Sequence, residues 1–254
     1  MDNKGFVIMA QGDDYVNCAK VLEASIKRAM PDANVTIITT DMLPYGDQDP
    51  TSNWKLINDW QVYEASPYEY TIKLEADMYL PQSIDYWWDV LKDHDVVVST
   101  SIRNFKQEVS DITYYRKFIL DNNLPDCYNA ITYFRKSDLA KQFFETVRNI
   151  FENWEDFRST LKCNVDETAT TDWVYAIACH ILGVEKTTLP QFSELTMIHM
   201  KQYVNGAFTE DWTETLIYEI LPHSFRISSI AQRYPVHYHV KRFANTLLEN
   251  LNEW

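Results

Sequence analysis

The stretch Tyr70-Thr71-Ile72-Lys73-Leu74-Glu75-Ala76-Asp77-Met78 alternates apolar and polar side chains and carries two acids near its end. With the two-residue period of a β-strand, Lys73, Glu75 and Asp77 point to one side and the apolar residues to the other. Both carboxylates should therefore project from one face, about 7 Å apart along the strand. The competing interpretation is that the two acids are only the solvent side of an edge strand.

The residues before this stretch predict a βαβ opening. Gly5 to Gln11 is a continuous apolar run, typical of a strand that is buried on both faces of a parallel sheet. Apolar residues recur at helical spacing from Tyr15 to Ala29, and Pro31 ends that pattern. Val35 to Thr40 reads as a second strand. We therefore expect an α/β fold, with a mostly parallel central sheet flanked by helices.

The later residues continue this theme and become less regular after about residue 190. Further strands are expected at Trp60 to Glu64, Val96 to Ser99 and Tyr128 to Phe134. Strands or loops are expected around Met197 to Met200 and Val236 to Val240. Helices are expected around Ile84 to Leu91, from Ser137 to Phe151 with Ser137 as the cap, and from Asp166 to Leu182 with Gly183 closing it.

Composition limits the functions that the chain could have. A length of 254 residues suits a single unit, and the net charge of −14 disfavours general affinity for nucleic acid or anionic membranes. The longest apolar stretch, Trp173 to Leu182, falls well short of the ~20 residues of a membrane helix, so no membrane insertion is expected. The four cysteines lie far apart without a Cys-x-x-Cys pair, which favours a cytoplasmic protein.

One segment runs against the acidic balance. Between Arg226 and Arg242 there are four basic residues and two histidines, and no acid. This segment is the best candidate for an anion-binding surface, DNA included. The alternative is a solvated basic face that offsets nearby acids.

The glycine count decides how a nucleotide could be bound. The only five glycines are too dispersed to build a Gly-x-Gly-x-x-Gly turn or a Gly-x-x-x-x-Gly-Lys loop. The phosphates of a bound nucleotide would then be neutralised another way, most simply by a divalent cation held on carboxylates, and Mg²⁺ or Mn²⁺ prefers such oxygen ligands. Glu75 and Asp77 lie where open α/β sheets bind ligands, at the carboxyl end of a strand.

At these residues the chain resembles the GT-A class of glycosyltransferases. Glu75-Ala76-Asp77 is similar to their Asp-x-Asp motif, and the approach from Ser66 to Leu74 is similar to the buried strand that precedes it. Glu75 replaces the usual first Asp and lengthens that arm. The matching motifs run in order from about residue 5 to residue 201. The resemblance implies one GT-A-like unit over 1–254, with a nucleotide-sugar-binding half at about 1–125 and an acceptor-binding half with a C-terminal extension at about 126–254.

The same resemblance implies the site residues. Ala10, Gly12 and Tyr15 belong to a turn that resembles the family's nucleoside contact, and Lys55 stands where such enzymes often have a basic residue. The remaining members come from two later motifs. Asn129 lies in a segment that resembles the family's strand along the donor sugar, although Ala130 departs from that motif. His199 and Lys201 lie in a segment that resembles a late motif of the family, whose histidine completes the metal shell and whose lysine approaches phosphate.

Two assignments have open alternatives. His237 and His239 repeat the spacing of His199 and Lys201 and are a rival metal or phosphate site, and a lone His199 is commonly a hydrogen-bonded core residue. Asp166 and Glu167 are the candidate catalytic residues for meeting the acceptor hydroxyl, with Asp172 as a weaker candidate. Acids at that position could instead only stabilise the dipole of a helix start.

The expected function is metal-dependent transfer of a sugar from a nucleoside diphosphate sugar, with UDP as the leading nucleotide and Mn²⁺ or Mg²⁺ as cofactor. The acceptor is a hydroxyl on a glycan or small molecule, or alternatively on a hydroxymethylated DNA base bound by the segment from Arg226 to Arg242. Two other classes stay open: a metal-dependent nuclease or phosphohydrolase that uses Glu75 and Asp77, and a non-enzymatic carbohydrate-binding module.

Overall fold

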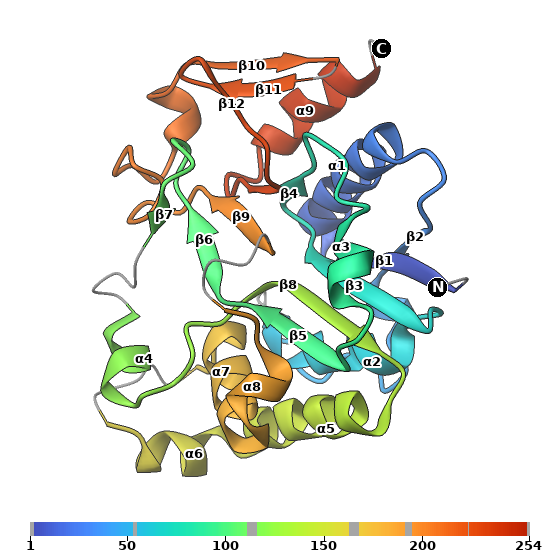
Figure 1. Cartoon of the computed structure of the whole chain (residues 1–254), viewed down its shortest axis with the longest axis vertical. Coiled ribbons are helices and arrows are strands. Elements are labelled where there is room, and N and C mark those ends of the chain that lie inside the picture. Colours follow the sequence, from blue (N-terminus) through green and yellow to red (C-terminus); the bar gives the residue numbers. More distant parts are fainter. Residues whose placement is uncertain are drawn as a thin grey trace.

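The computed structural model describes residues 3–52, 55–110, 116–162, 168–190, 195–222 and 224–252. Its first sheet has five strands (Figure 1). Their order is β2 (Val35–Ile38), β1 (Lys4–Met9), β3 (Tyr70–Glu75), β8 (Tyr128–Arg135) and β5 (Val96–Ser99). Only β8 runs opposite to the others in this sheet, because it pairs antiparallel with both β3 and β5. The predicted mostly parallel central sheet is confirmed.

The first sheet is covered on both faces, which explains the unbroken apolar run in β1. Phe6 and Ile8 belong to a core shared with helix α1 (Asp13–Ala29). Val7 and Met9 belong to a second core, built with α5 (Asp138–Glu152) and α7 (Thr171–Leu182). Because successive side chains of a strand face opposite ways, a strand between two cores has no polar side.

A second sheet stands at the carboxyl end of the first. Its order is β4 (Met78–Tyr79), β13 (Val236–His237), β9 (Thr196–His199), β6 (Ser101–Arg103) and β7 (Val109–Ser110). Residues far apart in sequence are thus neighbours, since His237 pairs with Met78 on one side and with His199 on the other. This sheet positions the site described below.

The last part of the chain forms a small antiparallel sheet and a closing helix. The sheet consists of β10 (Tyr218–Leu221), β11 (Ser224–Ile227) and β12 (Ile230–Ala231). Helix α9 (Phe243–Asn252) follows and lies against α1 (Figure 1). The shorter helices are η1 (Thr40–Met42), η2 (Leu56–Gln61), α2 (Val62–Ala65), α3 (Trp87–Leu91), α4 (Lys117–Asp121), α6 (Trp154–Thr160), α8 (Val184–Thr187) and η4 (Trp212–Glu214).

The predicted strand from Trp60 to Glu64 is wrong. These residues belong to η2 and α2, which pack as one helical stretch against α5. Polar side chains within η2 face inward and serve the preceding loop: Gln61 Oε1 accepts from Tyr45 N at 3.0 Å, and Asn58 Oδ1 accepts from Gln48 N at 2.9 Å. Both side-chain amides are buried and hydrogen-bonded, and the apolar pattern of Trp60 to Glu64 does not reveal such contacts.

The helix predictions hold better. Ser137 caps α5, with its hydroxyl accepting from Ala140 N at 3.3 Å, and Gly183 ends α7 with a φ of 92°. However, α7 begins at Thr171, so the predicted start at Asp166 is too early. Among the described residues, no helix is long and apolar enough to span a bilayer.

Candidate functional site

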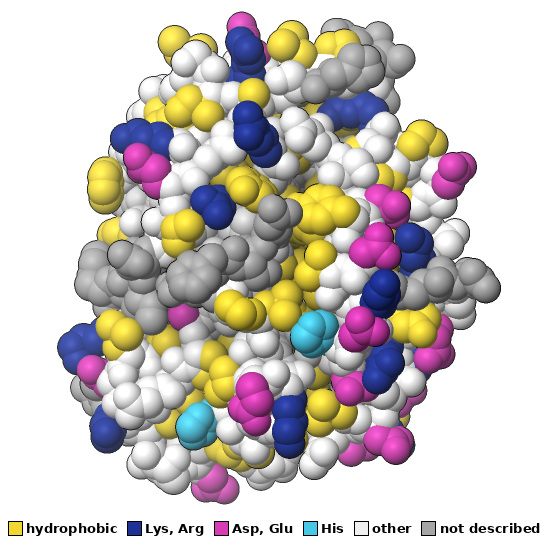
Figure 2. Space-filling view, viewed as in Figure 1, with side chains coloured by type: hydrophobic (Ala, Val, Ile, Leu, Met, Phe, Trp, Pro, Cys, Tyr) yellow, Lys and Arg dark blue, Asp and Glu magenta, His cyan; other side chains and the backbone are white. Residues whose placement is uncertain are grey.

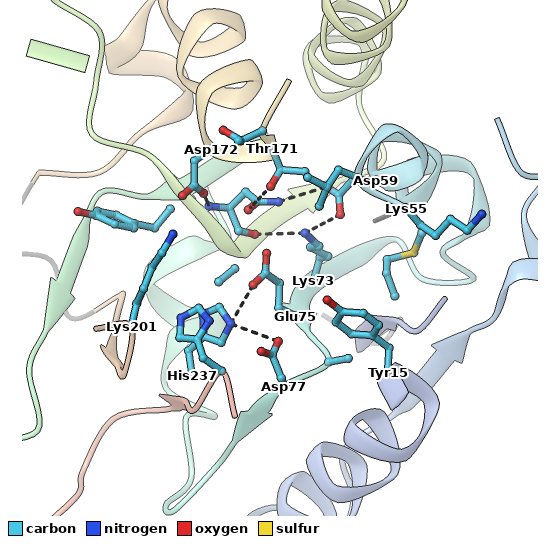
Figure 3. A pocket seen from close by; sticks show the side chains of 18 of the residues that line it. Tyr15, Lys55, Asp59, Lys73, Glu75, Asp77, Thr171, Asp172, Lys201 and His237 are labelled. Carbon is cyan, nitrogen blue, oxygen red and sulfur yellow. Dashed lines mark hydrogen bonds and ion pairs between the residues drawn. The ribbon is translucent and has the colours of Figure 1, made fainter. Parts of the chain in front are cut away.

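A cavity of about 460 Å³ opens where the two sheets meet, beyond the carboxyl ends of β1 and β3. Its lining combines carboxylates, amines and imidazoles with a few aromatic and apolar side chains (Figure 3). The charged and imidazole side chains are Lys55, Asp59, Lys73, Glu75, Asp77, Asp172, His199, Lys201, His237, His239 and Lys241. Ligands of open α/β sheets bind at this edge.

Glu75, Asp77 and His237 converge in this cavity (Figure 3). His237 Nε2 lies 3.1 Å from Glu75 Oε2 and 3.2 Å from Asp77 Oδ1. The prediction that both acids belong to one strand is wrong, since β3 ends at Glu75 and Asp77 lies in the turn before β4. They still meet because β4 pairs with β13, and Tyr238 N donates to Asp77 O at 3.0 Å.

The charges of this group balance one another. Burial would raise the pKa of Asp77, but His237 and Lys241 outweigh it and hold that pKa well below its ordinary value. Burial lowers the pKa of His237, yet the two carboxylates raise it above the ordinary range. For Glu75, whose side chain is 28 % exposed against 4 % for Asp77, burial dominates and raises the pKa. The Lys241 amine and the His237 imidazole thus face the two carboxylates directly.

The donor set fits a divalent ion. Neighbouring ligands of a six-coordinate ion with bonds of about 2.1 Å lie about 3.0 Å apart, close to the spacings measured around His237 Nε2. Two carboxylates and one imidazole are ligands that Mn²⁺ accepts readily. Among the described residues, His237 rather than the predicted His199 completes the carboxylate group.

His199 and His239 lie beside His237 without joining the carboxylates. His239 Nε2 lies 3.3 Å from His199 Nδ1, and the His237 and His239 rings are stacked with centroids 3.9 Å apart. Burial, followed by the neighbouring imidazoles, holds the pKa of His199 well below its ordinary value. The same two causes act on His239. Both of these rings are therefore neutral at pH 7.

The floor of the cavity is a buried polar network. Lys73 is 1 % exposed and its amine lies 2.7 Å from Asp59 Oδ1, while the Tyr175 hydroxyl donates to Asp59 Oδ2. In the amide orientation that satisfies its neighbours, Asn129 accepts from Lys73 Nζ at 3.0 Å and donates to Glu75 Oε1 at 3.1 Å. Lys73 thus holds the Asn129 amide, which in turn donates to Glu75. The predicted residue Asn129 lies in the cavity wall.

Asp172 also faces the cavity, at the start of α7 (Figure 3). Its carboxylate accepts from Arg116 Nη1 at 2.8 Å and from the Asn129 backbone N–H at 2.9 Å. Arg116 also pairs with Asp126 Oδ1 at 2.6 Å. Asp172 therefore ties the Asn129 strand to α7. The predicted catalytic residues Asp166 and Glu167 lie outside the described residues.

The other predicted residues are distributed unevenly. Tyr15 lines the cavity, with Lys241 Nζ 4.4 Å from its ring centroid, and Lys201 also lines it. Lys55 lies at the rim, where its amine pairs with Asp47 Oδ2 at 2.7 Å. Ala10 is fully buried in the core and Gly12 is exposed before α1. Met9 and Gln11 line the cavity in place of Ala10 and Gly12. The side chain of Ala10 points to the opposite face, because successive side chains of an extended chain alternate.

The basic segment from Arg226 to Arg242 does not form one surface. His237, His239 and Lys241 line the cavity. Arg242 pairs with Asp211 and Glu214, and Arg226 with Glu219 at 4.0 Å. On the face shown in Figure 2, Lys and Arg side chains lie scattered among acidic ones, without a continuous basic patch.

Comparison with solved structures identifies the fold. The structure resembles the galactosyltransferase LgtC in complex with donor and acceptor sugar analogs, at a TM-score of 0.56 and 12% identity over 98% of this chain and 95% of that one. It also resembles the bifunctional glycosyltransferase WbbM, at 0.55 and 12% over 99% of this chain and 50% of that one. For the glycosyltransferase GlyE of Streptococcus pneumoniae TIGR4 the values are 0.50 and 12%, over 99% and 63%.

No protein-family model matches the chain, and no curated protein matches it. The chain nevertheless has the GT-A fold of these enzymes, as its resemblance to that class predicted.

Proposed function

We propose that this chain, which has the GT-A fold, is a metal-dependent glycosyltransferase that uses a nucleoside diphosphate sugar, with UDP as the nucleotide and Mn²⁺ or Mg²⁺ as the ion. The observation that carries the proposal is the convergence of Glu75, Asp77 and His237 at one end of a cavity, at the ligand-binding edge of the sheet. The structural neighbours are themselves named as glycosyltransferases.

The chemistry requires stabilisation of a leaving diphosphate. The bond between the anomeric carbon and the diphosphate oxygen breaks, the acceptor oxygen forms a bond to that carbon, and the hydroxyl proton goes to a base. A bound divalent ion supplies Lewis-acid stabilisation of the charge on the leaving oxygens. Glu75, Asp77 and His237 would hold it, with His237 as the neutral imidazole. Lys201 extends along the cavity wall beside these ligands and would add a positive contact (Figure 3).

The remaining lining residues divide between donor and support. Tyr15 offers an aromatic face at the side of the cavity where β1 ends, and we assign it to the nucleoside (Figure 3). Asn129 borders the same space as Glu75 and is assigned to the sugar. Asp172 is a positioning residue, because its contacts hold Arg116 and the Asn129 backbone and amide in place. Asp166 and Glu167 stay the candidates for meeting the acceptor hydroxyl, with one of them as general base if the transfer inverts configuration.

For the acceptor we favour a hydroxyl of a glycan or small molecule over a DNA base. The net charge of −14 and the pairing of Arg226 and Arg242 with acids both oppose binding to a polyanion. A cytosolic location is part of the proposal, supported by the free thiols of Cys18, Cys127 and Cys179.

A thermal-shift screen tests the donor class. UDP, GDP, ADP and CMP are each added with and without Mn²⁺, and UDP with Mn²⁺ is expected to raise the Tm most. At a concentration ~100 times Kd the gain is about 2.7 kcal/mol, which for a chain of this size is a rise of about 6 °C. UDP alone and Mn²⁺ alone serve as controls and should each give a smaller shift. The proposal fails if none of the four nucleotides stabilises the protein, or if Mn²⁺ instead induces cleavage of plasmid DNA, as a nuclease requires.

A further inference from the structure

Three histidines lie next to the carboxylate pair, and the proposed transfer uses only His237 among them. His199 ends β9, His237 lies in the neighbouring β13, and His239 follows two residues later. One ring nitrogen from each lies within 4.8 Å of the others. His239 Nε2 and His199 Nδ1 lie 3.3 Å apart.

We propose that His199, His237 and His239 form a second metal site, made only of nitrogen ligands, that takes a borderline transition ion of the Zn²⁺ class. A tetrahedral zinc ion with nitrogen bonds of about 2.05 Å places neighbouring ligand atoms about 3.3 Å apart. His199 and His239 already stand at that spacing. Three imidazoles with an open fourth position form a recurrent zinc ligand set, whereas Mg²⁺ prefers oxygen ligands.

This site is distinct from the carboxylate site, although it shares His237 with it. Glu75 and Asp77 form a ligand group with His237 but not with His199 or His239. Opposite ligands of a six-coordinate ion lie only about 4.2 Å apart, so one ion cannot reach all five side chains in this arrangement. In the described part of the chain, His237 Nδ1 is buried and makes no hydrogen bond, while Nε2 faces the carboxylates.

The backbone conformation at His239 holds the three imidazoles together. His239 has a φ of 59°, a left-handed conformation that side-chain-bearing residues rarely adopt. Val240 N donates to Tyr238 O at 2.7 Å and closes a tight turn around it. The turn follows the strand directly and brings the His239 ring back over that of His237. Strained conformations of this kind persist where the surroundings hold them, often at functional sites.

Metal affinities of the apo protein test this inference without any sugar transfer, so its failure is separable from failure of the proposed function. Competition with a chelating dye gives the affinity for Zn²⁺ and for Mn²⁺. His239→Asn keeps a residue that tolerates positive φ and removes the imidazole. We expect it to weaken Zn²⁺ binding at least about 100-fold and to change Mn²⁺ binding less than about threefold. Glu75→Gln should show the opposite pattern, and exposed His180→Asn neither.

A spectroscopic measurement on the unaltered chain guards against variants that fail to fold. Co²⁺ replaces Zn²⁺ and should give the intense visible bands of a tetrahedral site, which His199→Gln should remove. The inference is overturned if Co²⁺ shows only weak six-coordinate bands. It is equally overturned if Zn²⁺ affinity survives in both His239→Asn and His199→Gln, or falls only in Glu75→Gln.

Discussion

Asp77→Asn is expected to lower the Mn²⁺-dependent hydrolysis of a UDP-sugar by about 10³-fold, equivalent to about 4 kcal/mol. Asp77 is the carboxylate that both His237 and Lys241 approach, and its low pKa keeps it charged throughout the neutral range. The amide keeps the shape of the side chain but supplies no charge to the ion. Slow donor hydrolysis, followed as UDP release across a set of UDP-sugars, needs no known acceptor.

Asp95→Asn is the matched control for this variant. Asp95 also pairs with a basic side chain, Arg135, at 2.8 Å, and it is not part of the cavity lining. Its replacement should leave hydrolysis within about twofold. If Asp77→Asn keeps more than a tenth of the activity while remaining folded, the ion does not act through this carboxylate.

The second large effect concerns stability. Lys73→Met should lower the free energy of unfolding by about 3 to 5 kcal/mol, because it leaves Asp59 as an uncompensated charge in the floor of the cavity. Asn129 would also lose its contact with the amine, so Glu75 would lose part of its support. Urea denaturation followed by tryptophan fluorescence measures the change.

Two further variants give this prediction a control and a rescue. Lys4→Met removes an exposed pair with Asp85, whose side chains are 35 % and 67 % exposed, and should cost less than about 1 kcal/mol. Adding Asp59→Asn to Lys73→Met removes the stranded charge and still offers an oxygen to the Tyr175 hydroxyl, so much of the loss should be recovered. Equal losses of unfolding free energy in Lys73→Met and Lys4→Met would show that the buried pair of Lys73 and Asp59 stabilises the fold no more than an exposed pair does.

Local patterns were enough to predict the first sheet and the position of the two acids. The apolar run of β1, the helical spacing of α1 and the alternation of β3 each depend on neighbours within a few residues. Pattern analysis also places Glu75 and Asp77 at the ligand-binding edge. It misplaces the end of β3, because the same alternation continues through the turn at Asp77 into β4.

The composition of the site depends on pairings that no local pattern contains. His237 reaches the carboxylates because β13 pairs with β4, and this strand pair joins distant parts of the chain. The one pattern in the sequence that points to His237 is its spacing with His239, which repeats the spacing of His199 with Lys201. That pattern does not decide which histidine is the metal ligand. No sequence pattern points to Asp59 as a site residue, because the residues after it predict a strand. Its partner Lys73 is predicted only to share a strand face with the two acids.

The most direct test of the central claim is a crystal of the protein grown with UDP and Mn²⁺, with diffraction recorded at the manganese absorption edge. We expect one strong anomalous peak within about 2.3 Å of Glu75, Asp77 and His237, with the diphosphate oxygens of UDP completing its coordination. A manganese peak elsewhere, or UDP bound in the cavity without any ion at these three side chains, would contradict the account.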